Sequence, residues 1–322
     1  MKRLDKLLTV DDLHVSFSTF RGIVYAVQGV SFEISKGEVV GVVGESGCGK
    51  SVTALSILRL IDEPPGKVSG KIEYQDKDII SLGQNEINKI RGKEISMIFQ
   101  NPGTALNPVF TIGEQMVRVI RKHRKLSSNE ARKEACSILA LVGLPEPERV
   151  IKNYPHQLSG GMKQRIIIGM ALSCKASLLI ADEPTTALDV TIQAQILKLL
   201  IELKEKLQIS IMLITHDIGV AAQTCDRIIV MYAGKIVEVG PKDELLKKPF
   251  HPYTAGLLRC LPNRVNCAKN LQVITGSVPD PIKPPKSCSF YPRCGFKMEK
   301  CFEQQPELKE VGSDRLCACF LQ

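Results

Sequence analysis

The sequence predicts an α/β fold with a mostly parallel central sheet. Two observations predict it: several short apolar runs have the character of strands buried on both faces, and helical stretches lie between and beside these runs. The chain has 322 residues, of which 44% are hydrophobic, so it is long and apolar enough to bury a sizeable core. Wholesale disorder is therefore excluded.

The N-terminal residues are expected to form antiparallel strands. Residues 7–17 and 31–34 partly alternate apolar with polar side chains, which is typical of half-exposed strands. Residues 19–28 between them have the character of a turn or hairpin. These strands would add an antiparallel β subdomain to the parallel core.

The parallel core begins at Val39–Val43, a run without polar side chains that ends at Gly44. Such a run suits a strand that is covered on both faces. Runs of the same character lie at 177–182, 209–215 and 228–232. Helices are expected at 50–60, 160–174, 190–207 and 218–224. The alternation of these strands and helices favours an α/β fold.

A helical block interrupts this alternation. Residues 110–153 contain two helical stretches, 112–122 and 129–142, with no convincing strand between them. We therefore expect a helical insertion at about 101–155, inside a domain that spans residues 1–250.

The composition changes near residue 250. Seven of the 11 cysteines and eight of the 18 prolines lie in residues 251–322. Clustered prolines favour irregular structure, so a small Cys/Pro-rich segment is expected there. The first residues do not have the pattern of a secretory signal, so a reducing cytosol is expected, which favours free thiols or metal thiolates over disulfides.

The charge balance leaves several classes of partner open. The 43 basic and 34 acidic residues give a net charge of +9, which nucleic acid, anionic lipid, phosphate ligands or a dispersed solvated surface would each explain. The dispersed surface is the favoured interpretation, and aromatic residues at 5% give little support for a platform that stacks single strands. No apolar stretch is long enough to span a bilayer, so a cytoplasmic location is expected.

The clearest chemical motif is a phosphate-binding loop. Residues 44–51 read Gly-Glu-Ser-Gly-Cys-Gly-Lys-Ser, which fits G-x-x-x-x-G-K-[ST], and they lie between an apolar strand and a helix. The glycines let backbone N–H groups face a polyphosphate, and the helix dipole adds positive charge. Lys50 would neutralise the β- and γ-phosphates, and the Ser51 hydroxyl would bind Mg²⁺. The expected nucleotide-binding residues are Gly44, Glu45, Ser46, Gly47, Cys48, Gly49, Lys50, Ser51 and Val52.

Cys48 lies inside this loop, close to Lys50 and to a helix N-terminus. Both features lower the pKa of a thiol, so Cys48 could be oxidisable. The alternative, which we favour, is a small residue that merely fits the loop.

An acidic pair complements the loop. Asp182 and Glu183 follow an apolar run. A carboxylate at the tip of a neighbouring buried strand can hold the magnesium shell, and we assign this role to Asp182. Glu183, one residue farther along, can polarise the attacking water as a general base.

Residues 158–165, Leu-Ser-Gly-Gly-Met-Lys-Gln-Arg, resemble the signature motif of ATP-binding-cassette proteins, which general phosphate-loop enzymes lack. Gln100 resembles the glutamine loop of that family, whose side chain joins the magnesium shell. Residues 187–189 resemble its dimer-contact loop, and His216 resembles its switch histidine. The resemblance implies the cassette fold and ATP hydrolysis. It assigns catalytic roles to Lys50, Gln100, Glu183 and His216.

The signature motif also has a physical interpretation. Ser159 can cap the helix that follows, and Gly160 and Gly161 leave backbone N–H groups open, which makes a second anion site. In the family this site binds the γ-phosphate of ATP held by the opposite subunit, so the resemblance implies two cassettes that close head to tail. The glutamine loop and the helical insertion are where transmembrane subunits would dock.

The adenine is usually stacked on an aromatic side chain upstream of the phosphate loop in this family. Phe20 and Tyr25 lie in the appropriate hairpin. Either could instead belong to the core.

Two C-terminal motifs narrow the resemblance. Residues 251–258 read His-Pro-Tyr-Thr-Ala-Gly-Leu-Leu, and residues 288–294 read Cys-Ser-Phe-Tyr-Pro-Arg-Cys. Both closely resemble the ATP-binding subunits of dipeptide, oligopeptide and nickel importers. The resemblance implies a peripheral ATPase on the cytoplasmic face of the membrane that energises import of di- or oligopeptides. Its implied partners are two permease subunits, a second cassette or another copy of this chain, and an extracytoplasmic binding protein, without nucleic acid.

Four C-terminal cysteines form a candidate metal site, and the importer branch has a similar set, which implies a [4Fe–4S] cluster. They are Cys288, Cys294, Cys301 and Cys319. Four thiolates would equally satisfy zinc, but structural zinc pairs usually lie about two to four residues apart, closer than any of these. Free thiols without a metal are a third, less favoured alternative. Cys317 competes with Cys319 as a ligand. Residues 318–320 resemble the terminal pattern of the branch, so Cys319 is assigned and Cys317 is interpreted as a packing thiol.

Two other classes of function are alternatives to the importer ATPase. A soluble cassette ATPase acting on nucleic acid or ribosomes would also explain the positive charge, but such proteins generally carry two cassettes or long coiled coils. This chain has one cassette and no sustained heptads. An iron-sulfur redox protein with a regulatory cassette is the least favoured class.

Overall fold

The structure is a computed structural model, which describes residues 5–100, 105–186, 188–261 and 274–322. The chain divides into two compact units. The first comprises Met1–Leu82 and Leu213–Gln322, and the second comprises Gly83–Met212.

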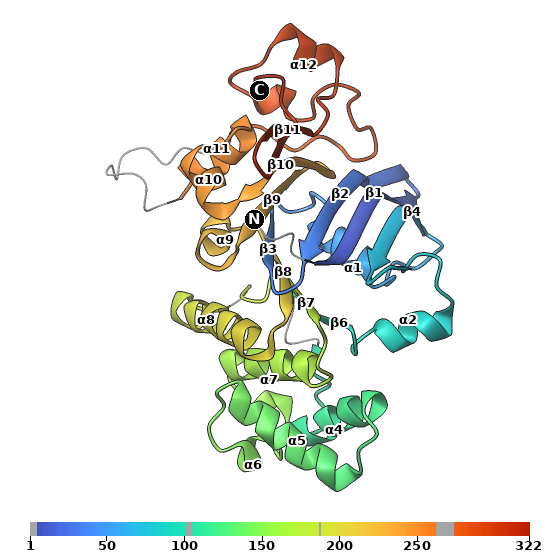
Figure 1. Ribbon diagram of the computed structural model, residues 1–322, viewed down its shortest axis with the longest axis vertical. Coiled ribbons are helices and arrows are strands. Elements are labelled where there is room, and N and C mark those ends of the chain that lie inside the picture. Colours follow the sequence, from blue (N-terminus) through green and yellow to red (C-terminus); the bar gives the residue numbers. More distant parts are fainter. Residues whose placement is uncertain (1–4, 101–104, 187, 262–273) are drawn as a thin grey trace. The chain divides into compact units, whose positions relative to one another are not determined.

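The first unit contains an antiparallel sheet in the order β2-β1-β4-β5, drawn in blue and cyan in Figure 1. Its strands are β1 (Lys6–Thr19), β2 (Gly22–Ser35), β4 (Gly66–Tyr74) and β5 (Lys77–Asp78). The antiparallel pairing of the N-terminal strands is confirmed. The connection between β1 and β2 is shorter than the turn or hairpin expected at residues 19–28. The Thr19 hydroxyl donates to the Gly22 carbonyl over 2.7 Å, and β2 starts at Gly22.

A second group of strands in this unit contains the buried run expected from the sequence. β3 (Val39–Val43) is buried at every residue and pairs in parallel with β9 (Arg227–Tyr232). β10 (Lys235–Pro241), a strand not predicted from the sequence, pairs antiparallel with β9. α9 (Ile218–Thr224) approaches β3 so closely that a Cβ on Gly41 would lie 2.7 Å from the Cys225 sulfur. A glycine in β3 therefore permits the helix to pack.

The C-terminal segment is integrated into this unit. β12 (Arg315–Cys317) pairs antiparallel with β10, and β11 (Lys309–Gly312) pairs with β12. The Arg315 guanidinium donates to the Glu238 carboxylate over 2.7 Å, and both side chains are buried. The change of composition at residue 250 therefore does not coincide with a change of core. The helices among the described residues of this unit are α1 (Lys50–Ile57), α9, α10 (Lys242–Lys247), α11 (Pro252–Arg259), the 3-10 helix η3 (Tyr291–Arg293) and α12 (Glu299–Glu303).

The second unit contains the other parallel pair. β6 (Ile95–Ile98) pairs with β7 (Leu178–Asp182), whose residues are all buried. β8 (Ser210–Thr215) starts in this unit and continues into the first. The other helices of the parallel core are α2 (Gln84–Ile90), α7 (Gly160–Leu172) and α8 (Val190–Leu207). The strands and helices expected between 160 and 215 are thus confirmed to within a few residues.

The two helices expected between 110 and 153 are confirmed as α4 (Ile112–His123) and α5 (Ser128–Leu141), drawn in green in Figure 1. Both begin with a capping box, since the hydroxyls of Thr111 and Ser127 each accept from a backbone N–H three residues later. The short helices α6 (Pro147–Val150) and η1 (Pro155–Gln157) follow. Residues 101–104 of the expected insertion lie outside the described residues.

Candidate functional site

The phosphate-binding loop lies between β3 and α1 in the first unit. Gly44 has no room for a side chain, because a Cβ there would lie 2.2 Å from the carbonyl oxygen of Met231. Gly49, the N-cap of α1, has a φ of 99°, a conformation that favours glycine. The fold thus explains why glycine is needed at two positions of the motif.

The Lys50 side chain lies inside the loop. Its ammonium donates to the carbonyl oxygens of Gly44 at 2.8 Å and Glu45 at 3.0 Å. The residue is only 4% exposed. A buried ammonium in the curve of such a loop can neutralise the oxygens of a polyphosphate, which supports the role assigned to Lys50.

Cys48 is buried in the loop, with its sulfur 3.9 Å from the Lys50 ammonium. Burial raises the pKa of the Cys48 thiol, although the charge of Lys50 opposes this effect. A buried, protonated thiol is inert. The structure therefore supports the interpretation that Cys48 is a small residue that fits the loop.

Two residues from beyond position 250 contact the loop, and neither contact was predicted from the sequence. The hydroxyl of Tyr253 accepts the backbone N–H of Glu45 at 2.9 Å. The Arg293 guanidinium donates to both oxygens of the Glu45 carboxylate, at 2.8 and 3.0 Å. Partners separated by 208 and 248 residues leave no local pattern in the sequence.

The acidic pair lies at the end of β7 in the second unit. Asp182, the last residue of β7, is buried, and Glu183 has a φ of 45°, which is unusual for a residue other than glycine. One oxygen of the Glu183 carboxylate accepts from the Gln100 amide at 2.8 Å and from the Thr186 hydroxyl at 2.9 Å. The structure thus brings the predicted catalytic residues Gln100 and Glu183 together. Thr186 is an additional contact that the sequence did not indicate.

The signature residues lie at the start of α7. Ser159 is the N-cap, and its hydroxyl accepts the Met162 N–H at 3.3 Å, so the expected cap is confirmed. Gly160 and Gly161 form the first turn, whose N–H groups have no partner within the helix itself. Asp189 of the expected dimer-contact loop caps α8, whereas Ala187 lies outside the described residues.

The expected switch histidine, His216, follows β8 in the first unit and is exposed. Asp217, next to it, caps α9 by accepting the Gly219 N–H at 2.7 Å. The expected magnesium shell of Ser51, Gln100 and Asp182 draws on residues of both units, so it stays a prediction.

Phe20 and Tyr25, the candidates for stacking adenine, both lie on the β1–β2 hairpin. Phe20 is 99% exposed and Tyr25 is 41% exposed. The alternative that Phe20 packs in the core is therefore wrong, and both rings are accessible to a base.

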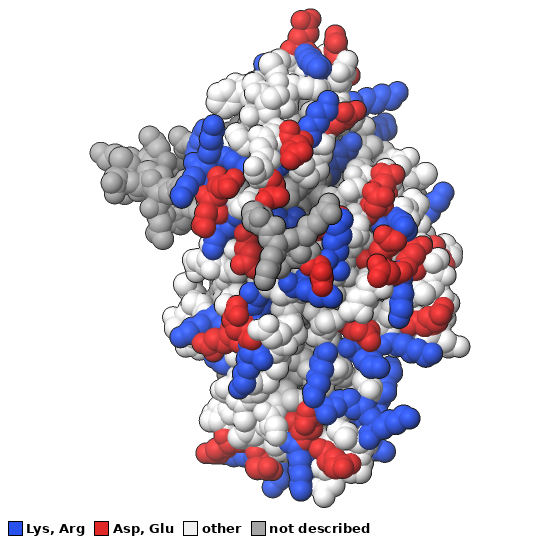
Figure 2. All heavy atoms as spheres, in the orientation of Figure 1, with Lys and Arg blue, Asp and Glu red and all other residues white. Residues whose placement is uncertain are grey.

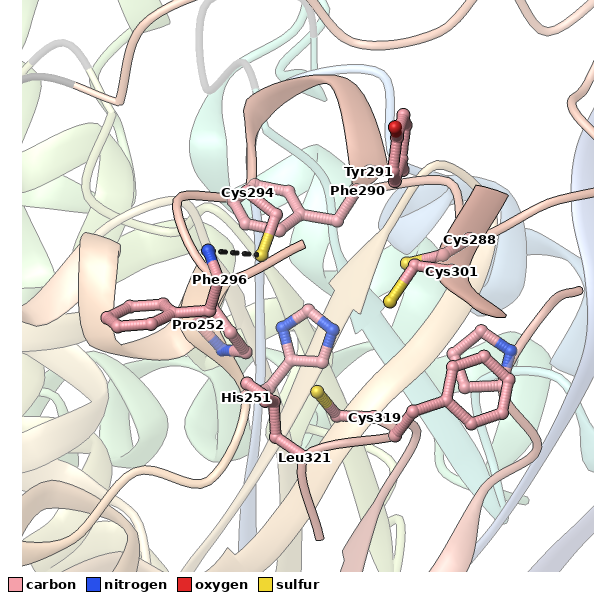
Figure 3. A pocket seen from close by; sticks show the side chains of 12 residues that line it. His251, Pro252, Cys288, Phe290, Tyr291, Cys294, Phe296, Cys301, Cys319 and Leu321 are labelled. Carbon is pink, nitrogen blue, oxygen red and sulfur yellow. Dashed lines mark hydrogen bonds between the residues drawn. The ribbon is translucent and has the colours of Figure 1, made fainter. Parts of the chain in front are cut away.

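The four assigned cysteines line one pocket in the first unit, together with His251 (Figure 3). The rest of the lining is almost entirely apolar and aromatic. Nδ1 of His251 accepts the Tyr253 N–H at 3.0 Å, and burial lowers the pKa of His251 to about 3, so the ring is neutral. Cys317 does not line this pocket and is buried in β12. This arrangement supports the choice of Cys319 over Cys317.

Backbone N–H groups point at three of the four sulfurs. The Phe296 N–H donates to Cys294 at 3.4 Å. The backbone N–H groups of Phe290 and Leu321 act on the thiols of Cys288 and Cys319 and lower their pKa values. Such hydrogen bonds stabilise thiolates. Burial nevertheless raises the pKa of Cys288 to about 11, so its thiol is protonated at neutral pH unless a cation compensates.

Across the part of the chain that the structure describes, no three His, Cys, Asp or Glu side chains lie close enough together to hold one metal ion. The described residues therefore give no support to a metal at the pocket cysteines, neither to zinc nor to an iron-sulfur cluster.

The surface in Figure 2 shows basic and acidic side chains interspersed. On the face in view, this agrees with the dispersed surface favoured above. Among the described helices, none has both the length and the apolar character needed to cross a membrane.

Two family models match the chain. The model described as "ABC transporter" matches residues 27–186. The model described as "Oligopeptide/dipeptide transporter, C-terminal region" matches residues 237–301. The first match contains the phosphate loop, the signature and the acidic pair, and the second contains three of the four pocket cysteines.

Curated relatives match the chain over nearly its whole length. The dipeptide transport ATP-binding protein DppD of Bacillus subtilis (strain 168) is 50% identical over 99% of this chain and 96% of its own length. The oligopeptide transport ATP-binding protein OppD of Escherichia coli (strain K12) is 45% identical over 99% of this chain and 94% of its own length.

Solved structures share the fold of most of the chain. The ATP-binding cassette MJ0796, described as a dimeric post-hydrolysis state bound to ADP and Pi, is 31% identical with a TM-score of 0.65. The match covers 73% of this chain and 99% of that one. The structure of cbiO1 from Clostridium perfringens, described as part of the transporter complex cbiONQ, matches with a TM-score of 0.65 and 29% identity over 76% of this chain and 92% of that one.

Proposed function

Because this chain belongs to the ABC transporter family, we propose that it hydrolyses ATP to energise the import of peptides through partner permeases. One observation carries the proposal: the phosphate loop, signature and acidic pair occur in the same chain as the C-terminal region of oligopeptide/dipeptide transporters. The relatives named as peptide transport ATP-binding proteins match this whole arrangement and not the cassette alone.

In the proposed cycle the loop binds the phosphates of ATP, with Lys50 neutralising their charge. Glu183 takes a proton from the attacking water, and Gln100 orients the Glu183 carboxylate through their 2.8 Å hydrogen bond. Mg²⁺, which ATP brings with it, would be held by Ser51, Gln100 and Asp182 and would offset the charge that develops on the phosphates. His216 is the fourth residue to which we assign a catalytic role.

The proposed working form is a dimer of cassettes in which each Ser159 contacts the nucleotide of the other subunit. The capped start of α7 supports this, because its open N-terminal N–H groups are suited to an anion that another subunit supplies. The related cassette MJ0796 is described as dimeric with ADP and Pi. The second subunit is either another copy of this chain or a related cassette.

This arrangement predicts complementation between two inactive variants. Ser159→Ala should bind ATP yet fail to hydrolyse it, and Lys50→Ala should fail to bind ATP. A mixture should recover activity, because a heterodimer contains one intact composite site. The measurement is the rate of phosphate release from mixed and unmixed samples.

Ser127→Ala is a matched control, because Ser127 caps α5 with the same 3.3 Å geometry but lies outside the signature. This variant should hydrolyse ATP at the wild-type rate. Its free energy of unfolding should fall by about 1 kcal/mol, because a helix cap is lost. Heterodimers that form but recover no activity would show that the sites are not composite or that both must act together.

The proposed place of action is the cytoplasmic face of the cell membrane, where two permease subunits bind the cassettes and an extracytoplasmic binding protein delivers the peptide. The experiment is reconstitution of the chain with permease subunits in vesicles, followed by assay of ATP hydrolysis and peptide uptake. Uptake that depends on this chain supports the proposal. Hydrolysis that responds to DNA or ribosomes and not to permeases would favour the soluble ATPase instead.

We further propose that the four pocket cysteines hold a [4Fe–4S] cluster. The donor set supports this, because four cysteines line one pocket and thiolates are the usual ligands of such a cluster. The N–H groups directed at Cys288, Cys294 and Cys319 would stabilise the thiolates. The cluster would link parts of a segment that is poor in apolar residues, with redox sensing the alternative role.

A further inference from the structure

The phosphate-binding loop carries one acidic side chain, Glu45, beside the backbone that is proposed to face ATP. A carboxylate at this place repels the phosphates of an approaching nucleotide. The phosphate-loop motif does not specify a residue type at the position of Glu45. The motif alone therefore does not explain how the loop tolerates a negative charge there.

The structure pairs this carboxylate with Arg293. Nη1 of Arg293 donates to Oε2 of Glu45 at 2.8 Å, and Nη2 donates to Oε1 at 3.0 Å, which makes a bidentate pair. The Arg293 side chain is 5% exposed and that of Glu45 is 28% exposed. Limited exposure to water means that solvent screens this pair only weakly.

The position of Arg293 is fixed by further contacts within the same unit. Its guanidinium also donates to the carbonyl oxygens of Ile274 at 3.1 Å and Thr275 at 3.0 Å, and to the Tyr232 hydroxyl at 3.3 Å. The charge of Arg293 is therefore held in one place by acceptors on three segments. A lysine could not reproduce this planar set of hydrogen bonds.

The backbone of Glu45 is also held by a residue of the C-terminal segment. The Tyr253 hydroxyl accepts its N–H at 2.9 Å, and the Tyr253 ring packs against Tyr232 and Phe290 with ring centroids 4.7 and 5.5 Å apart. Phe290 lines the cysteine pocket, and Arg293 directly precedes the pocket residue Cys294. The pocket and the loop are thus connected by direct contacts.

We propose that Arg293 is a positioning residue for nucleotide binding: it neutralises Glu45 and fixes that carboxylate against the C-terminal segment, so that the segment sets the affinity of the loop for ATP. This rests on the proposed function, because it requires that the loop binds ATP. The C-terminal segment then contributes to the ATPase itself as well as to the cysteine site. Any change in the pocket that moves Arg293 also changes ATP binding.

The test compares three variants of the full chain: Arg293→Met, Glu45→Gln and the double variant. The measurement is the Kd of Mg-ATP, obtained by displacement of a fluorescent ATP analogue. Arg293→Met should raise the Kd about tenfold, because an unpaired carboxylate then remains beside the phosphate site. The double variant should bind ATP within about twofold of wild type, because it has neither charge. Glu45→Gln alone should lower the Kd, because the charge of Arg293 is then uncompensated.

The double variant distinguishes an electrostatic role of Arg293 from a merely structural one, because only an electrostatic role predicts that Glu45→Gln restores ATP binding. If Arg293 only supported the fold, neutralising Glu45 would not restore binding, and the double variant would stay as weak as Arg293→Met. Wild-type affinity of Arg293→Met would also overturn the proposal. Should Arg293→Met not fold, Glu45→Gln still decides the question, because weaker ATP binding by that variant contradicts the electrostatic account.

Arg227→Met is the matched control. Arg227 makes a similar bidentate pair with Glu38 in the same unit, at 2.7 and 3.1 Å, away from the loop. It should lower the melting temperature without changing the Kd. Lys50→Ala tests the underlying function separately, since undiminished ATP binding by that variant would refute nucleotide binding at the loop and not the role of Arg293 alone.

Discussion

Glu183→Gln should retain ATP binding while its turnover falls by about 10²- to 10⁴-fold, the usual contribution of a general base. The glutamine keeps the size of the side chain and an oxygen that can accept from Thr186, but it cannot take a proton from water. Since ATP then binds without being hydrolysed, the variant should also accumulate as an ATP-bound dimer. Turnover is measured by phosphate release and the dimer by size-exclusion chromatography with ATP.

Thr186→Val is the appropriate control for this experiment. It removes the 2.9 Å hydrogen bond to Glu183 but leaves the carboxylate and its contact with Gln100 in place. A modest fall in rate, far smaller than that of Glu183→Gln, is expected. Near-normal hydrolysis by Glu183→Gln would place the base elsewhere, with His216 the next candidate.

Cys319→Ser should remove iron and sulfide from the anaerobically purified protein, whereas Cys317→Ser should retain them. Wild type should be brown and contain about four iron atoms per chain with equal sulfide, and Cys319→Ser should contain almost none. The structural reason is that Cys319 lines the pocket with the other three cysteines, while Cys317 is buried in β12. Metal analysis, a sulfide assay and the visible spectrum provide the measurement.

Each cysteine variant is the control for the other, because the substituted residues are two positions apart and both substitutions replace a thiol by a hydroxyl. Cys317→Ser places a hydroxyl in a buried site, so it should lower stability by roughly 1–3 kcal/mol while leaving the spectrum intact. Zinc in place of iron would refute the cluster. Loss of iron from Cys317→Ser but not from Cys319→Ser would refute the ligand assignment.

The features predicted correctly from the sequence are those encoded over a few neighbouring residues. The buried run Val39–Val43 and the helices at Val190–Leu207 and Ile218–Thr224 occur at the expected residues, because strand and helix periodicities are local. The Ser159 cap is also a local hydrogen bond, made with a residue three positions later. Motifs of this kind can be found without knowledge of the rest of the fold.

The sequence by itself therefore determined the α/β elements, the phosphate loop and the family resemblance. Only the tertiary structure decided that β12 pairs with β10 across the expected boundary at 250, and that Arg293 forms an ion pair with Glu45, 248 residues away. It also distinguished the pocket position of Cys319 from that of Cys317. The physical reason is that such pairs form only when the whole chain has folded, and their free energy depends on burial and neighbours that no short stretch of sequence specifies.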